Sequence, residues 1–418
     1  MKDKNKSEKN SRGGKPAAAA RKKAGNPPSA RTGSKKRGKK AAALLKLTVF
    51  LLFLLAVVFV AAGRLGTVAF SNAADGFRGF IAGLTPGPGY PAALKSGHIV
   101  SVDTIGSRNI VLDGDSVRVL NSSAKELLNS QHTYSDPVID VCNGRAVVFD
   151  RSSGRYKVCS ATRVLYESKV EQNILTAAIG KKGNVAIASK SAAAQSELRV
   201  FDRRNKSLFI WECESERIAA VALSANGKGA AVAVIGSKNA QLYSKLFVFD
   251  FKKSSPLAVF EYPGTALIQL EFGRNNKVLA LGDNLFSVAD TRQKTKKDTP
   301  FGGDVLLRAA FSENGMAAVA LSSYGSASQS NLKVFGSDGS LRFEDAVNSE
   351  IRWVSCDGKN VAVLTGSEVL CYNGNGERTG AVTGRRKSQK AMILGRKIYV
   401  LEAGTLYNYP VAGSENTG

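Results

Sequence analysis

The chain has 418 residues and a formal net charge of +25 at pH 7, from 59 Lys and Arg against 34 Asp and Glu. Its two His, His98 and His132, have no second ligand or base at a useful spacing, which argues against a zinc site and a His-based catalytic triad. A Walker A loop and a Gly-x-Ser-x-Gly elbow are also absent, which excludes the NTPases and hydrolases that carry these motifs.

The chain begins with a strongly basic segment. Residues 1–46 hold 16 Lys or Arg against two acids, Asp3 and Glu8, and no bulky apolar side chain precedes Leu44. Such a segment buries too little surface to offset the entropy lost on ordering. We therefore predict a disordered tail over residues 1–42.

An apolar run follows the tail. Residues 47–63 contain Thr48 as their only clearly polar side chain, and a helix of this length spans about 25 Å. Because Lys46 can snorkel to the head groups, the helix can start earlier and cross a bilayer. We predict one transmembrane helix over residues 43–63.

The flanking charges predict the orientation of this helix. The 16 early cations precede the apolar run, whereas only Arg64 and Arg78 follow soon after it. The positive-inside rule then places the N-terminus in the cytoplasm and the rest of a single-pass membrane protein outside. The tail either contacts anionic inner-leaflet lipids or serves only to set topology. A signal peptide cleaved at Ser71-Asn72-Ala73 is the alternative, but that site lies well beyond the apolar run.

Residues 64–95 connect this helix to the rest of the chain. Apolar residues recur there at helical spacing, namely Phe70, Phe77, Phe80, Ile81 and Leu84. This spacing predicts a short helix on the outer membrane surface or a continuation of the anchor. Residues 85–91, which read Thr-Pro-Gly-Pro-Gly-Tyr-Pro, break any helix and form a linker.

A repeated strand ending characterises residues 96–412. In each repeat a short apolar strand is followed at once by a turn-former, and successive repeats are 37 to 48 residues apart. The last strand residues are Leu120, Cys159, Phe201, Phe249, Ala289, Phe335, Tyr372 and Tyr409. A period near 40 with several strands per unit is typical of a β-propeller. We predict an all-β fold of eight blades, with seven as the alternative, and a disordered C-terminus over 413–418.

The fourth repeat shows most clearly how four strands make a unit. Its strands, named A to D in chain order, are Ile218–Leu223, Gly229–Ile235, Leu246–Phe251 and Leu257–Tyr262. Small and β-branched residues fill strand B, as expected for a strand that neighbouring blades cover on both faces.

Two repeats are irregular. The fifth has a degenerate strand D near Lys296–Phe301, and the eighth shows three strands over residues 388–411. We predict that a strand near His98–Asp103 completes the eighth unit and closes the ring.

The turns and strand ends carry a family resemblance. Ser224-Ala225-Asn226-Gly227 and Ser312-Glu313-Asn314-Gly315 are matching turns, and Val-Phe-Asp ends strands at Asp202 and Asp250. The propeller resembles quinoprotein-like and WD40-like propellers. The whole layout resembles an uncharacterised family of membrane-anchored propeller proteins from Gram-positive, Clostridia-type bacteria. The Trp-Asp blade ending, a calcium loop and a tryptophan docking motif are absent, so the resemblance implies no catalytic residue and no cofactor.

The five cysteines are predicted to be buried free thiols. Cys142 and Cys159 fall on strands A and C of one unit, as do Cys356 and Cys371 of another. Strands A and C lie about 9.6 Å apart, twice the spacing between neighbouring strands. A disulfide needs Cα atoms within about 7 Å, so these pairs cannot form. Cys213 is the fifth thiol.

Strand direction sorts the connections onto two faces of the wheel. The A–B and C–D turns share one face, here called the turn face, and the B–C and D–A loops share the other, the loop face. The turn face is basic across three neighbouring units, and such a field attracts polyanions. We predict that it binds anionic wall polymers or lipid head groups, with ordinary solvated turns as the alternative. Its basic residues are Lys181, Lys182, Arg203, Arg204, Lys206, Lys228, Lys252, Lys253, Arg274, Lys277, Arg292, Lys294, Lys296 and Lys297.

The loop face has the longest predicted connections, over residues 190–196, 236–244 and 322–330. Insertions on one face of a repeat fold often mark its binding side, and Tyr beside small polar residues suits a protein or carbohydrate contact. Unselected loop variation is the alternative. The predicted contact residues are Lys190, Gln195, Lys238, Gln241, Tyr243, Tyr324 and Gln329.

These patterns favour a non-enzymatic docking scaffold at the outer face of the cell membrane. Its expected partners are envelope proteins or anionic wall polymers, with no nucleic acid, cofactor or metal, since Asp113-Gly114-Asp115 is too short for a calcium loop. The first alternative is an enzyme or small-ligand sensor that uses the central channel, and the second is an assembly factor for envelope proteins. Carboxylates gathered in the channel would favour the first alternative, and an uncharged, plugged channel would favour docking.

Overall fold

The structure is a computed structural model, and its described residues are 46, 48–54, 57, 76–79, 81, 85–94, 98–275, 277–322, 329–383 and 386–411. The chain divides into two units, residues 1–65 and 66–418. In the first unit, residues 46, 48–54 and 57 are helical. Among the described residues no helix has both the length and the apolar character needed to cross a bilayer. The predicted tail, most of the predicted transmembrane helix and residues 413–418 lie outside the described residues.

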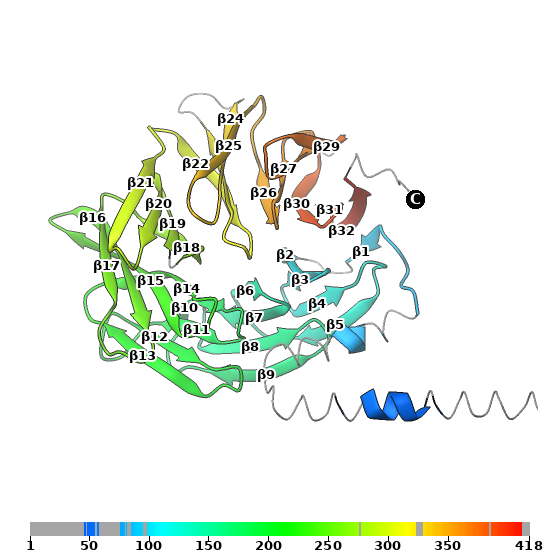
Figure 1. The fold of residues 1–418 in the computed structure, drawn as a ribbon, viewed down its shortest axis with the longest axis horizontal. Helices are drawn as coiled ribbons and strands as arrows, with labels where there is room; N and C mark the ends of the chain where they lie inside the picture. The colour runs from blue at the N-terminus through cyan, green and yellow to red at the C-terminus, as the bar shows by residue number, and fades with distance from the viewer. Residues whose placement is uncertain are drawn as a thin grey trace, which may run out of the picture. The chain divides into compact units, whose positions relative to one another are not determined.

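The second unit contains an all-β wheel, in which the described residues make eight four-stranded antiparallel sheets arranged as blades (Figure 1). The prediction of eight blades is thus confirmed, and the seven-blade alternative is wrong. Blade 1 comprises β2 (Ile99–Ile105), β3 (Arg108–Asp113), β4 (Ser116–Leu120) and β5 (Glu126–Gln131), and blade 2 comprises β6 (Pro137–Cys142), β7 (Arg145–Asp150), β8 (Arg155–Ser160) and β9 (Val164–Lys169). Blade 3 comprises β10 (Ile174–Ile179), β11 (Val185–Ser189), β12 (Ser196–Phe201) and β13 (Ser207–Cys213). Blade 4 comprises β14 (Arg217–Leu223), β15 (Gly229–Lys238), β16 (Gln241–Asp250) and β17 (Ala258–Pro263).

The remaining blades follow the same order. Blade 5 comprises β18 (Leu267–Phe272), β19 (Lys277–Gly282), β20 (Leu285–Asp290) and β21 (Thr295–Pro300), and blade 6 comprises β22 (Val305–Phe311), β23 (Ala317–Ser322), β24 (Ser330–Phe335) and β25 (Leu341–Val347). Blade 7 comprises β26 (Trp353–Asp357), β27 (Asn360–Leu364), β28 (Glu368–Tyr372) and β29 (Arg378–Thr383). Blade 8 comprises β30 (Ser388–Leu394), β31 (Lys397–Glu402), β32 (Thr405–Pro410) and β1 (Ala92–Ala93).

The hydrophobic core lies between the blades rather than inside them. Alternation along β15 shows why: Val232 and Val234 pack toward blade 3, whereas Ala231 and Ala233 pack toward blade 5. Because the side-chain period of a strand is two, one strand supplies apolar side chains to both of its neighbours. Each adjacent pair of blades shares one such cluster, including the pair formed by blades 8 and 1.

The ring closes differently from the prediction. The two-residue strand β1 supplies the outer strand of blade 8, with Ala92 opposite Leu406 and Ala93 opposite Thr405. The predicted closing strand near 98–103 instead belongs to β2, the inner strand of blade 1. The sequence pattern missed β1 because two alanines give no periodic signal. Its pairing is formed by backbone groups, including the N–H of Leu94, which donates to the carbonyl of Gly404 at 2.9 Å.

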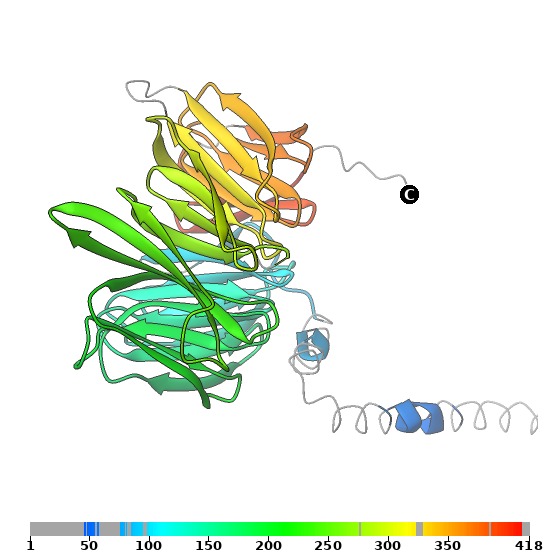
Figure 2. The same cartoon turned by 60° about the vertical axis from the view of Figure 1, so that its left-hand side comes forward.

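One predicted loop is in fact a hairpin. Strands β15 and β16 continue through residues 236–244 and meet at a two-residue turn, Asn239–Ala240, in which both residues have positive φ. This is the backbone conformation of a tight hairpin turn. Figure 2 shows the resulting ribbon projecting from its blade. The connection after Ser189 is a loop as predicted, whereas residues 323–328 of the third connection lie outside the described residues.

The cysteine strand assignments are confirmed. Cys142 and Cys159 lie on β6 and β8 of blade 2, and Cys356 and Cys371 lie on β26 and β28 of blade 7. Cys159, Cys213 and Cys371 are buried free thiols, whereas Cys142 and Cys356 are free but only half-buried.

Candidate functional site in the central channel

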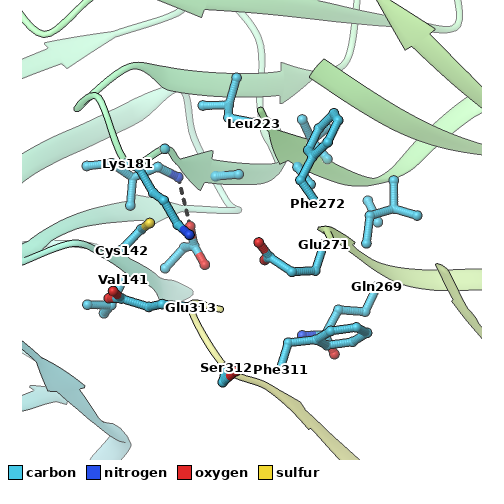
Figure 3. Close-up of a pocket in the computed structure, with 18 of the residues that line it drawn as sticks. Val141, Cys142, Lys181, Leu223, Gln269, Glu271, Phe272, Phe311, Ser312 and Glu313 are labelled. Atoms are coloured by element: carbon cyan, nitrogen blue, oxygen red, sulfur yellow. Dashed lines mark hydrogen bonds between the residues drawn. The ribbon is translucent and has the colours of Figure 1, made fainter. Parts of the chain in front are cut away.

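The inner strands of blades 1 to 7 enclose a central cavity of about 440 Å³ (Figure 3). Each of these blades contributes its strand A, the first strand of the blade in chain order, to the lining. The cavity reaches the turn face, where the A–B turn residues Gly106, Ala225 and Asn314 form part of its wall. Its lining therefore comes from segments spread over more than 250 residues of sequence, from Asp103 to Gly358.

Carboxylates dominate the charged part of this lining. Asp103 comes from β2, Asp140 from β6, Glu271 from β18 and Glu313 from the A–B turn of blade 6. Lys181, in the A–B turn of blade 3, is the one Lys or Arg among the described residues that line the cavity. Figure 3 shows Glu271, Glu313 and Lys181 directed into the same space. The channel is thus neither uncharged nor plugged.

Burial and neighbouring charges raise the pKa values of three of these carboxyl groups, those of Asp103, Asp140 and Glu271. Burial raises the pKa of Asp140 to about 7, and the charges of Asp103 and Glu313 add to the shift. Burial also raises the pKa of Glu271 to about 8, with a contribution from Asp140 and partial opposition from Lys181. The pKa of Asp103 is raised as well, again first by burial. Crowded carboxyl groups oppose one another's ionisation, so the raised pKa values favour the protonated forms of these groups near neutral pH.

Water reaches these groups although the protein surrounds them. Asp103 and Glu313 are exposed to water inside the cavity, and Asp140 and Glu271 are half-buried. A group that is open to water can exchange its proton or accept a soluble ligand. The raised pKa values therefore belong to an accessible site rather than to a sealed core.

Two of the inner-strand carboxylates have a structural role. Asp140 Oδ2 accepts a hydrogen bond from the N–H of Ile179 at 2.8 Å, and Asp357 Oδ2 accepts one from the N–H of Gly395 at 2.6 Å. The first bond joins the inner strands β6 and β10 of neighbouring blades, and the second joins β26 to the A–B turn of blade 8, so both connect separate sheets. They satisfy backbone donors where the blades diverge. Asp140 therefore contributes to blade contacts as well as to the charge of the cavity.

Glu313 connects opposite parts of the channel rim. Its Oε1 accepts a hydrogen bond from the N–H of Asn143 at 2.7 Å, although the two residues are 170 positions apart in blades 6 and 2. Asn143 in turn donates from Nδ2 to the carbonyl of Lys181 at 2.9 Å. This chain of contacts positions Lys181 and Glu313 beside the same opening.

The chemistry of the lining favours binding over nucleophilic catalysis. The thiol of Cys142 faces the cavity, but burial and then the charges of Glu313 and Asp140 raise its pKa, which keeps it protonated. Neither His98 nor His132 lines the cavity. Within the described ranges no three His, Cys, Asp or Glu side chains are grouped closely enough to hold a metal ion.

Comparison with known proteins places the chain in a family. A family model described as "Family of unknown function (DUF5711)" matches residues 94–406. The chain belongs to the DUF5711 family. The match begins directly after β1 and ends within β32, so it covers blades 1 to 7 and the strands β30 and β31 of blade 8 in the DUF5711 propeller. A search of curated proteins finds no match.

Three solved structures are similar to this chain, each with a TM-score below 0.5. BamB from Moraxella catarrhalis is 11% identical to this DUF5711 chain, with a TM-score of 0.49, and the match covers 78% of this chain and 99% of that one. The β-propeller domain of Cps50 (Swd1) from Myceliophteria thermophila is 10% identical, with a TM-score of 0.48 and coverage of 77% and 99%. Apo AztD from Citrobacter koseri is 12% identical, with a TM-score of 0.46 and coverage of 69% and 86%. At these identities the likeness concerns the fold alone.

The predicted basic residues of the DUF5711 propeller lie on blades 3, 4 and 5, with three differences in detail. Lys181 points into the channel rather than outward. Lys296 and Lys297 belong to β21 rather than to a turn, and Lys296 pairs with Asp298 and lies 4.3 Å over the ring of Tyr262. Lys277 Nζ donates to the carbonyl of Asp338 at 3.2 Å. Most of the others are exposed, namely Lys182, Arg204, Lys206, Lys228, Lys252, Lys253, Arg274, Arg292 and Lys294.

The predicted loop-face residues differ in their exposure. Lys190, Gln195, Lys238, Gln241 and Gln329 are exposed, whereas Tyr324 lies outside the described residues. Tyr243 does not present a free ring, because its hydroxyl donates to Glu216 Oε1 at 3.1 Å and Lys245 lies 5.3 Å over the ring. The hairpin of β15 and β16 explains this, since it holds Tyr243 in a strand.

The sequence analysis allowed for carboxylates that meet in the channel, but it predicted no specific residues there. One acid on each of several inner strands produces no local motif. Strand A of each unit was identifiable, so a search for acids near the ends of these strands would have found Asp103, Asp140 and Glu271.

Proposed function

We propose that the protein is a membrane-anchored, non-enzymatic binding protein that takes a small organic cation into its central channel. The observation that carries this proposal is the 440 Å³ cavity lined by Asp103, Asp140, Glu271 and Glu313. Its volume falls within the range of small-molecule sites, about 300–1,000 Å³. This reading takes the sensor alternative of the sequence analysis over docking alone, because the channel holds carboxylates.

Proton storage in the cavity suits an ammonium ligand. A cation placed among the carboxylates favours their ionised forms, so it displaces the protons that burial retains. Binding would then release protons and become tighter as the pH rises through the pKa values near 7 and 8. Lys181 restricts where the positive charge of the ligand can lie.

Docking to envelope proteins or anionic wall polymers is a second candidate function. The exposed cations on the turns of blades 3 to 5 favour it, since a one-sided cluster attracts polyanions. The two functions use different surfaces and are compatible. In both, the propeller lies outside the membrane, as the charge distribution around residues 43–63 predicts.

Isothermal titration calorimetry on the full-length protein tests the channel. The panel comprises ethylammonium, linear diammonium compounds of increasing length, Mg²⁺ and acetate. The proposal expects at least one ammonium compound to bind with proton release, and acetate not to bind. Lack of binding by every ammonium compound, or preference for acetate, would contradict it. Conversion of a bound compound into a product would instead show an enzyme.

A further inference from the structure

The chain enters the propeller on the turn face. The N–H groups of Gly87 and Gly89 donate to Ser123 Oγ and to the Ser123 carbonyl, both at 3.0 Å. The hydroxyl of Tyr90 donates to the carbonyl of Asn121 at 2.9 Å. Ser123 and Asn121 lie in the C–D turn of blade 1, between β4 and β5. The linker that precedes β1 is therefore bound to the turn face.

A helical segment upstream of the linker lies against the same face. Residues 76–79 and 81 are helical. Gly79 packs so tightly against the guanidinium of Arg108 that a Cβ there would collide with it. Arg108 directly follows the A–B turn of blade 1.

This segment exposes apolar side chains to solvent. Phe77 is 64% exposed and Ile81 is 50% exposed. Residues four apart on a helix share one side, so the two form a small apolar surface. An exposed apolar helix face is typical of a segment that lies in a lipid interface, and the guanidinium of Arg108 beside Gly79 adds a cation there.

The turn face also carries most of the exposed cations predicted from the sequence. Contacts show that these turns are neighbours: a Cβ at Gly227 would lie 3.0 Å from Cβ of Lys182, and Asn184 Nδ2 donates to the Gly227 carbonyl at 2.8 Å. The exposed cations thus form one basic area across blades 3 and 4, and blade 5 adds Arg274, Arg292 and Lys294.

We infer that the turn face docks onto the anionic phospholipids of the membrane in which the chain is anchored. Lys and Arg on blades 3 to 5 bind lipid phosphates, and Phe77 and Ile81 insert at head-group level. A wall polymer would use the cations but would leave the apolar pair in water, so the lipid surface accounts for both. This inference rests on the proposed membrane anchor.

Docking would place the channel mouth against the lipid head groups. The cavity opens at A–B turns of the turn face, where Lys181 and Glu313 lie. The cation that enters the channel would then come from the membrane surface, where anionic lipids concentrate cations.

Amide hydrogen exchange on the full-length protein in nanodiscs tests this inference. One nanodisc contains phosphatidylcholine only, and the other contains phosphatidylglycerol as well. We expect several-fold slower exchange for residues 202–206, 224–228, 250–254 and 290–294 in the anionic nanodisc, and no change in residues 190–195 of the loop face. The protection should disappear in 1 M salt, where the Debye length is about 3 Å.

Two charge-reversal variants identify the surface involved. The first combines Lys182→Glu, Lys228→Glu, Lys252→Glu and Arg292→Glu, and we expect it to lose the protection. The matched control combines Lys190→Glu, Arg217→Glu, Lys238→Glu and Lys387→Glu on the loop face, and we expect it to keep the protection. The basic tail is identical in all variants, so its own lipid binding cancels.

The outcomes separate this inference from the membrane anchor. A protein that does not enter nanodiscs contradicts the anchor. Insertion without protection of the turns contradicts the docking surface alone, as does equal loss of protection in both variants. Protection by a soluble glycerol-phosphate polymer in phosphatidylcholine nanodiscs, without protection by phosphatidylglycerol, would identify the polymer as the occupant and overturn the lipid assignment.

Discussion

The inner strands and the outer turns of this propeller carry opposite charges. The channel gathers Asp103, Asp140 and Glu271 from separate blades, whereas the C–D turns of blades 3 to 5 present Lys and Arg to solvent. The outer charges are clustered in the sequence. They reduce the free energy of unfolding only slightly, because water still solvates them. The inner charges are dispersed in the sequence and become crowded only when the ring closes, which raises their pKa values. The distribution of charge along the sequence therefore predicts the basic turn face more readily than the acidic channel.

The largest expected effect comes from the interface between blades. Phe286 is fully buried and stacks on Phe335 of the next blade, with ring centroids 4.1 Å apart. Phe286→Ala should lower the free energy of unfolding by about 3–5 kcal/mol. Ile210→Ala, on an outer strand where Ile210 is 51% exposed, should change it by about 0.5 kcal/mol or less. Urea unfolding of both variants measures the difference, and equal effects would show that the blades do not share a core.

The channel carboxylates should make the protein less stable as the pH rises. The folded pKa values of Asp140 and Glu271, about 7 and about 8, lie above those of the unfolded chain. The folded state then binds more protons than the unfolded state between about pH 4 and 8, so the free energy of unfolding falls over that window. Glu271→Gln should reduce the fall by an amount on the order of 2 kcal/mol. Urea unfolding at pH 5 and pH 8 measures the change in the free energy of unfolding with pH. If the substitution left this change unaltered, Glu271 would not be one of the carboxyl groups that cause it.

The affinity for the ammonium ligand tests whether the channel or the basic turn face holds the ligand. Glu271→Gln should weaken binding of the ammonium ligand about tenfold, since a hydrogen bond to a charged group contributes roughly 1.5–3 kcal/mol. The control Glu350→Gln removes an exposed carboxylate of the loop face and should leave the affinity unchanged. Calorimetric titration compares them. If the variant with four charge reversals on the turn face weakened binding as much as Glu271→Gln does, the ligand would not be held by the channel.

The smallest effect concerns the bond across the channel rim. Glu313→Gln keeps an oxygen that can accept from the N–H of Asn143, whereas Glu313→Ala removes it. We expect the alanine variant to lose about 1 kcal/mol of stability, the value of a typical hydrogen bond, and the glutamine variant to lose less. Thermal unfolding at pH 7 compares the two. Identical melting temperatures would mean that the bond does not stabilise the ring.

Particular residues show how far sequence reasoning reached. The strand endings from Leu120 to Tyr409 predicted eight blades because each blade repeats the same pattern of strands and turns. The closing strand β1 was missed because Ala92 and Ala93 form too short a strand to show any pattern. The hairpin turn at Asn239–Ala240 was read as part of a loop, although its two positive-φ residues are what a tight turn requires.

The repeat and the clusters of basic turn residues could be predicted from periods and local composition in the sequence. Where the ring closes and which acids meet could not be predicted, because both depend on contacts between segments that are distant in the sequence. Blades 2 and 6 lie far apart along the chain, yet Asn143 and Glu313 are hydrogen-bonded. Closing a ring converts such distant positions into neighbours. In the same way it brings Asp140 of blade 2 and Glu271 of blade 5 into one cavity, and the burial that raises their pKa values is a property of the closed wheel rather than of any single blade.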